Sequence, residues 1–85
     1  MKTGVQFTGT LAPNETHQWF SHSWNPDWQV VWHMMPTAPQ TGDSQIEWSV
    51  AVERTAPDQC TYWVTVKNLT ANTVTFEGRY VVFNA

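Results

Sequence analysis

The spacing of turn-forming residues is the feature that most constrains how this 85-residue chain can fold. Gly, Pro, Asn, Asp and Ser favour turns through their backbone conformations and side-chain hydrogen bonds, and they divide the chain into short segments. The turns predicted from them are Ala12–Glu15, Asn25–Asp27, Pro36–Ser44, Ala56–Asp58 and Asn68–Asn72. No segment between them has apolar residues at i, i+3, i+4 and i+7, the spacing that predicts a helix. The strands predicted instead are Val5–Leu11, Thr16–Trp24, Trp28–Met35, Gln45–Arg54, Cys60–Asn68 and Thr73–Phe83.

The composition also favours strands. Thr, Val and aromatic residues pack well on a pleated sheet, and Phe, Trp and Tyr together make up 14% of the chain. Cys60 is the only cysteine, so no disulfide within the chain can stabilise the fold. A chain of this length buries only about 60% of the surface that its unfolded form exposes, so we expect an efficient core or association of subunits. We predict one all-β domain over residues 1–85, a small antiparallel β-sandwich of about six strands, with barrel-like closure as the alternative.

Alternation of apolar and polar residues predicts how the fourth and fifth strands pair. The residues expected to face inward are Ile46, Trp48, Val50 and Val52 in the fourth strand and Tyr62, Val64 and Val66 in the fifth. Directly opposed residues of an antiparallel pair lie on one face, so one register can bring these two sets together. That register pairs Val52 with Tyr62, Val50 with Val64, Trp48 with Val66, Glu47 with Lys67 and Ala51 with Trp63. It leaves Trp63 facing outward.

The second and third strands are predicted to form a hairpin around Asn25–Asp27. Strand parity then divides their side chains between the core and the opposite face. The inward set is Phe20, Trp24, Trp28, Val30, Trp32 and Met34, and the outward set includes His17, Trp19 and His33. In the sixth strand Gly78 predicts a β-bulge or a neighbouring aromatic ring lying over the glycine. Trp32 and Trp48 are expected in the core.

The charge pattern excludes several classes of partner. The net charge is −3, and the only fixed cations are Lys2, Arg54, Lys67 and Arg79. Four scattered cations do not form the basic surface that nucleic acids or anionic lipids require. No apolar run approaches the roughly 20 residues of a membrane span. The first residues show no signal-peptide pattern, and the sequence leaves the compartment open.

No arrangement of residues indicates an enzyme, a cofactor or a metal site. Glu53 and Asp58 flank one turn and could approach each other, but the sequence around them is typical of solvated surface carboxylates and not of a catalytic pair. Cys60 is predicted to point into the core without a base beside it. His17 and His33 would lie diagonally on one face of the predicted hairpin, but two histidines without a third ligand make a weak metal site. We therefore expect a non-enzymatic protein that uses neither a cofactor nor a metal.

Two Asn-X-Thr sequences, beginning at Asn14 and Asn68, match the acceptor pattern for N-glycosylation. Both fall in predicted turns, where Asn and Thr are favoured because of their own hydrogen bonds to the backbone. Turn chemistry is the favoured interpretation of both sequences.

Tryptophan carries the functional prediction, because a flat aromatic ring can stack on the apolar C–H face of a sugar while polar neighbours bind its hydroxyls. Parity places Trp63 and Trp19 on outward faces, so we expect both to be stacking platforms. The groups expected to hydrogen-bond the sugar are Asn25 and Asp27 in the turn, His33 beside Trp19, and Arg79, which lies beside Trp63 in one register. The first hypothesis is a lectin-type carbohydrate-binding module that acts as a homo-oligomer.

The second hypothesis is a structural or accessory β-sandwich whose aromatic face mediates assembly with itself or another protein, without a small ligand. Val30–Trp32 and Val81–Phe83 are apolar on both faces, and monomers rarely expose large apolar patches. A third hypothesis, oligomerisation on a membrane surface, follows from the preference of aromatic residues for the membrane interface. The sequence offers neither an amphipathic helix nor a long insertion hairpin to support it.

Overall fold

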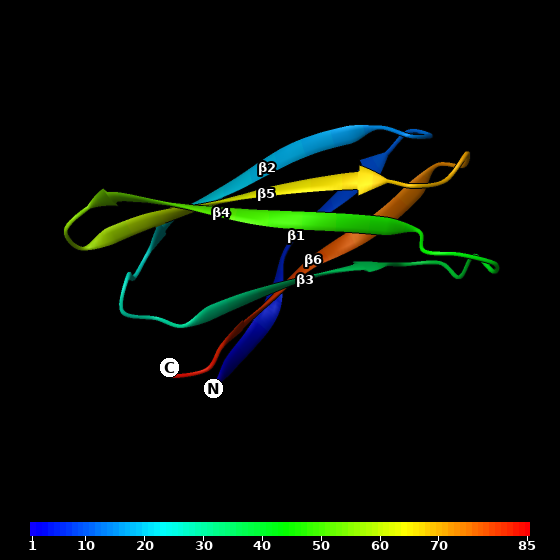
Figure 1. Ribbon diagram of the computed structural model, residues 1–85. Coiled ribbons are helices and arrows are strands. Elements are labelled where there is room, and N and C mark those ends of the chain that lie inside the picture. Colours follow the sequence, from blue (N-terminus) through cyan, green and yellow to red (C-terminus); the bar gives the residue numbers. More distant parts are fainter.

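The computed structural model describes all 85 residues and contains six strands and no helix. The strands are β1 (Lys2–Leu11), β2 (Thr16–Trp24), β3 (Val30–Pro36), β4 (Ile46–Ala56), β5 (Gln59–Asn68) and β6 (Val74–Val82). Each overlaps one of the predicted strands, and they form two layers (Figure 1). The predicted small antiparallel β-sandwich is confirmed. The barrel-like alternative is wrong, because the strands form two separate three-stranded sheets.

The chain passes repeatedly between these sheets. Sheet A has the strand order β1-β6-β3, sheet B has the order β2-β5-β4, and all neighbours are antiparallel. Only β4 and β5 are both consecutive in sequence and paired in a sheet. Every other connection crosses from one sheet to the other, so β6 lies between β1 and β3 (Figure 1).

The β4–β5 hairpin has the register that the alternation predicted. Val52 lies opposite Tyr62 and Ala51 opposite Trp63. The remaining predicted partners also match: Val50 with Val64, Trp48 with Val66 and Glu47 with Lys67. Local sequence can determine the register of two strands joined by a short turn, because side-chain alternation and turn length then specify the same pairing.

The predicted hairpin between the second and third strands is wrong. β2 pairs with β5 and β3 pairs with β6, so the chain leaves sheet B at Trp24 and enters sheet A at Val30. The register of β2 shifts between Ser21 and Trp24, where Ser23 has a φ of 65°. This β-bulge adds one residue, so residues on its two sides follow opposite parities.

The β2 bulge inverts the predicted facing of two aromatic residues. Trp24 faces inward as predicted and is buried. Before the bulge, Trp19 packs against the core, whereas Phe20 is 60% exposed. The sequence predicted the reverse for both residues, because it applied one parity to the whole strand.

Aromatic rings fill one part of the core. Trp24 lies with its ring centroid 5.4 Å from Trp32 and 5.2 Å from Tyr80, both nearly edge-on. The Trp24 indole Nε1 donates a hydrogen bond of 2.7 Å to Ser21 Oγ, whereas the buried Trp32 Nε1 has no partner. The buried aliphatic and sulfur-containing residues around these rings are Leu11, Met34, Cys60, Val64, Val66 and Val82.

Gly78 accommodates a ring of the neighbouring strand. A Cβ atom at Gly78 would lie 2.6 Å from the ring of Phe7, so only glycine leaves room for that ring. The register of β1 shifts between Val5 and Phe7, opposite Gly78 and Arg79. Of the two predicted explanations, the covering ring is confirmed, whereas the bulge lies in the partner strand β1 and not at Gly78.

The inward face of β4 is left partly uncovered. Trp48, Val50 and Val52 share the face of the buried β5 residues, yet they are 38%, 40% and 63% exposed. The expectation that Trp48 lies in the core is therefore wrong, whereas Trp32 is buried as predicted. Trp48 instead stacks on His33 of β3, with ring centroids 5.6 Å apart.

Candidate binding site

The outer face of sheet B carries a pair of aromatic rings, the exposed Phe20 and the half-buried Trp63, which we call the aromatic platform. Phe20 on β2 lies directly opposite Trp63 on β5, and Ala51 on β4 is the next residue across the sheet. The two ring centroids are 5.2 Å apart, and the ring planes differ by 35°. The rings therefore form one shallow apolar surface rather than an edge-on pair.

Trp63 extends from β5 across β4. Its indole Nε1 donates a hydrogen bond of 3.2 Å to Glu53 Oε1, and Glu53 lies two residues beyond Ala51 on β4. The methyl side chain of Ala51 leaves room for the indole to lie over the neighbouring strand. This hydrogen bond fixes the ring orientation and places a carboxylate at the edge of the platform.

Other polar groups border the platform. Gln18 Nε2 donates a hydrogen bond of 3.1 Å to Thr65 Oγ1 beside it on the sheet. The imidazole of His22 lies 6.3 Å from the Phe20 ring, and its Nδ1 is hydrogen-bonded to Ser23 Oγ at 2.9 Å. A surface of rings with hydrogen-bonding groups at its rim is suited to an amphipathic ligand with one apolar face.

Trp19, the second predicted platform, lies between the sheets. Its ring stacks on Phe7 at 5.7 Å and meets Phe76 edge-on at 5.1 Å. A Cβ atom at Gly9 would lie 2.6 Å from the Trp19 ring, so the glycine makes room for it. Trp19 therefore belongs to the aromatic packing of the core and forms no outward platform.

His33 and Arg79 lie on the outer face of sheet A. They are direct partners in the β3–β6 pairing, and the Arg79 Nη2 makes an ion pair of 2.9 Å with Glu77 Oε1. They line a shallow groove of about 330 Å³ together with apolar residues such as Val5 and Val81. The register that placed Arg79 beside Trp63 is wrong, because β5 and β6 belong to different sheets.

The same sheet assignment separates the two histidines that were expected to lie diagonally on one face. His17 lies on β2 in sheet B and meets Trp19 edge-on at 4.6 Å, while His33 lies on β3 in sheet A. No three His, Cys, Asp or Glu side chains gather closely enough to hold a metal ion.

Asn25 and Asp27 lie in the connection that crosses between the sheets. Asn25 Oδ1 accepts a hydrogen bond of 2.9 Å from the Asp27 backbone N–H, and the Asp27 carbonyl accepts one of 2.9 Å from Asn84 Nδ2. These contacts are those of an Asx turn tied to the C-terminal segment. The six predicted site residues are therefore divided among the core, both outer faces and this connection.

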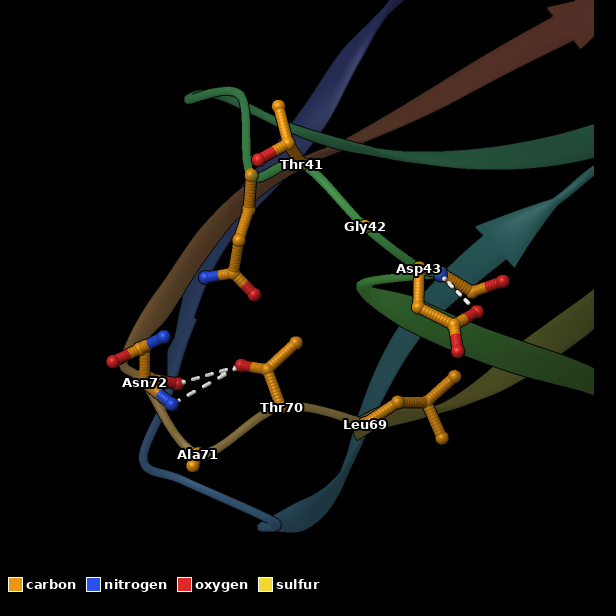
Figure 2. A pocket seen from close by; sticks show the side chains of 9 residues that line it. Thr41, Gly42, Asp43, Leu69, Thr70, Ala71 and Asn72 are labelled. Atoms are coloured by element: carbon orange, nitrogen blue, oxygen red, sulfur yellow. Dashed lines mark hydrogen bonds between the residues drawn. The ribbon is translucent and has the colours of Figure 1, made fainter.

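The largest hollow lies at one end of the sandwich and has a volume of about 400 Å³. Figure 2 shows Thr41–Asp43 of the β3–β4 loop facing Leu69–Asn72 of the β5–β6 loop across it. Two of its polar residues bond to each other: Thr70 Oγ1 donates to the Asn72 carbonyl at 3.1 Å and accepts from the Asn72 N–H at 3.2 Å. No aromatic ring lines it, so it offers no stacking surface.

Asn68, the first residue of one predicted acceptor sequence, is fully buried. Its Nδ2 donates to the carbonyls of Ala12 and Asn72, and its Oδ1 accepts from the Thr70 N–H at 2.9 Å. Asn14, at the other acceptor sequence, occupies a turn with a φ of 60°. Both asparagines have the turn roles that the sequence favoured.

Ionisable groups in the core are few. Burial raises the pKa of Tyr62 from 10.0 to about 12, and the adjacent Cys60 thiol adds to the rise. Tyr62 therefore stays neutral inside the sandwich over the ordinary pH range. The structure contains no helix long and apolar enough to cross a membrane.

Two residues of the site were not predicted. Phe20 was assigned to the core, and only the polar run Ser21–Ser23 hints at the bulge that turns it outward. Glu53 was considered only as half of a possible acid pair. Glu53 is two residues from Ala51 and therefore points from the same outer face, and this alternation could have placed it beside Trp63.

Comparison with known proteins gives no relative. The chain matches no family model, and neither the curated proteins nor the solved structures provide a match. The arguments for function therefore rest on the site itself.

Proposed function

We propose that this protein is a non-enzymatic carbohydrate-binding module of lectin type, in which the aromatic platform stacks on the C–H face of a sugar ring. The observation that carries this proposal is the Phe20–Trp63 pair on the outer face of sheet B, in which Phe20 is 60% exposed and Trp63 is half-buried. Apolar rings in such a position contribute little to the core, so a ligand that covers them would gain their burial.

The polar rim supplies the second half of sugar recognition. Sugar hydroxyls both donate and accept hydrogen bonds, and the carboxylate of Glu53 accepts while the amide of Gln18 does both. Glu53 is already oriented by the Trp63 indole N–H, at 3.2 Å. A rigid ring with a fixed acceptor at its edge lowers the entropic cost of binding.

The test is a glycan array with fluorescently labelled protein, followed by titration of the free sugar. We expect selective binding that the free sugar competes away, and a loss of about tenfold or more in Trp63→Ala and Phe20→Ala. Both variants should keep the β-sheet circular dichroism, because both rings lie outside the core. Trp48→Ala removes an exposed indole elsewhere and should bind the free sugar like the parent. A blank array, or binding that Trp63→Ala leaves unchanged, would contradict the proposal.

A second candidate function is favoured by the uncovered face of β4, where Trp48, Val50 and Val52 are exposed. Here the protein is a structural or accessory β-sandwich whose apolar surfaces mediate assembly and bind no small ligand. Intrinsic fluorescence separates the two functions. Tryptophan emission that responds to sugar supports the module, whereas emission that shifts on dilution without responding to sugar supports assembly alone.

A further inference from the structure

β4 is the edge strand of this fold with the longest regular stretch open to pairing. The other edges carry features that discourage it: β1 and β2 contain bulges, and β3 has only seven residues and ends in Pro36. β4 has eleven residues. Its own register shift lies near its end, between Glu53 and Ala56, and its register with β5 is regular over the eight residues from Ile46 to Glu53, the longest regular run among the four edge strands. The segment Trp48–Val52 contains no charge, proline or glycine. Long, regular, apolar edges of this kind are templates for another strand.

We propose that a second copy of this chain pairs with β4 in antiparallel fashion, around a two-fold axis that places Ala51 opposite Ala51 of the second copy. Identical strands give self-complementary pairing, in which residues equally distant from the axis face each other. With Ala51 at the axis, the residues Ser49–Glu53, all within the regular part of β4, pair with one another.

Avoidance of like charges also favours this register. It pairs Glu53 with the uncharged Ser49 of the second copy. Moving the axis to Val50 would set Glu47 opposite Glu53 twice, and like charges directly opposed destabilise a sheet. Moving it to Ser49 would pair Val52 with Ile46, so the residues of β4 after Val52 would lie opposite the loop that precedes β4 in the second copy.

The pairing has a consequence for the aromatic platform. A two-fold axis perpendicular to the joined sheet keeps both outer faces on one side. Because Trp63 lies opposite Ala51, the two Trp63 residues lie on one line across the strands of the joined sheet, with the two β4 strands between them. Three strand spacings of about 4.8 Å put their backbones about 14 Å apart. Two platforms facing one way would bind a multivalent glycan surface with avidity. The dimer itself follows from the edge geometry and does not depend on the proposed function.

Disulfide trapping tests the register. In a Cys60→Ala background, Ala51→Cys places each new thiol opposite its own copy, within the range that a cross-strand disulfide requires. Ser49→Cys and Val50→Cys are matched controls, since their opposite residues are Glu53 and Val52. We expect covalent dimer from Ala51→Cys about tenfold faster than from either control under mild oxidation. Equal rates at the three positions, or a faster rate at a control position, would overturn the register.

Light scattering tests the dimer without any cross-link. The parent is expected to approach twice the chain mass of 9.8 kDa as concentration rises. Val52→Lys should remain monomeric there, because lysine on an edge discourages pairing and Val52 is 63% exposed in the single chain. Val31→Lys, at a 50% exposed position on sheet A, should behave like the parent. A parent that stays at one chain mass, or a dimer that Val52→Lys does not weaken, would overturn the proposal.

The two proposals can fail separately. Val52→Lys should bind a soluble monovalent sugar as the parent does, and lose only its avidity for a glycan-coated surface. Loss of binding in Trp63→Ala with an intact dimer would leave the interface standing. A monomeric parent that still binds sugar would leave only the platform.

Discussion

β4 and β5 have nearly the same sequence pattern, but their apolar side chains differ in how much they are exposed. Both alternate apolar and polar residues, they pair in the predicted register, and the apolar sets Trp48–Val50–Val52 and Tyr62–Val64–Val66 share one face. Yet Val64 and Val66 are 1% and 0% exposed, while Val50 and Val52 are 40% and 63% exposed. The difference arises because sheet A covers the centre of sheet B and leaves its β4 edge open.

This contrast shows that alternation and burial are separate properties. Alternation decides which face a side chain points from, since the side-chain period of a strand is two. Burial depends on whether another element lies over that face. An apolar stripe that no other element covers adds little to the stability of the single chain and instead indicates a surface that binds another molecule.

The largest effect that would test this contrast is expected at the end of β5. Asn68→Ala should lower the free energy of unfolding by about 3 kcal/mol, because it removes a fully buried amide whose hydrogen bonds connect two loops. Urea unfolding followed by tryptophan fluorescence measures the loss. Ile46→Ala, at the residue opposite on β4, should cost less. A larger loss at Ile46 than at Asn68 would show that the two strands do not differ in the expected way.

The most direct comparison uses two valines that face each other across the β4–β5 ladder. Val64→Ala should destabilise the fold by about 2 kcal/mol, since it removes buried methyl groups and leaves a cavity. Val50→Ala should cost about 0.5 kcal/mol in dilute solution, because its side chain is 40% exposed. If β4 pairs with a second copy, the cost of Val50→Ala should rise with protein concentration. Equal costs for the two valines in dilute solution would refute the difference in coverage.

Tyr62 provides a pH-dependent test of β5 burial. The pKa of Tyr62 is about 12 in the folded protein, whereas an unperturbed tyrosine, as in the unfolded chain, has a pKa of 10.0. As the pH rises, the unfolded chain therefore loses this proton before the folded protein does. The contribution to stability is therefore complete below pH 10.0 and disappears as the pH rises toward about 12. Urea midpoints measured across this range should fall for the parent. Tyr62→Phe has no proton to lose and should show a smaller fall; identical curves would exclude Tyr62 as the cause.

The smallest effect is expected where both strands face solvent. Glu47 and Lys67 lie opposite each other on the outer face, with opposite charges. Exposed pairs of this kind contribute about 0.2–1 kcal/mol, so Glu47→Ala or Lys67→Ala should lower stability by less than about 0.5 kcal/mol. A double-mutant cycle in urea isolates the coupling, and added salt should reduce it. A coupling above about 1 kcal/mol would mean that this face is less exposed than the structure shows.

For the candidate site, local pairing was predictable and longer-range placement was not. Trp63 was correctly placed outward, because the β4–β5 register depends on parity and a short turn. Phe20 and Trp19 were exchanged, because a bulge of one residue after Ser21 reverses the parity of the strand before it. Arg79 was expected beside Trp63, but the strand that follows β5 crosses to the other sheet.

The sequence by itself determined the all-β class, the approximate positions of six strands, the β4–β5 register and the role of Asn68 in a turn. These features depend on residues close together in the chain, where turn chemistry and side-chain alternation act directly. The tertiary structure alone decided that four connections cross between the sheets, that Trp19 joins the core and Phe20 the surface, and that β4 remains uncovered. Those outcomes depend on which strands pack together from distant parts of the chain, and the energy of that packing is not encoded in any local pattern.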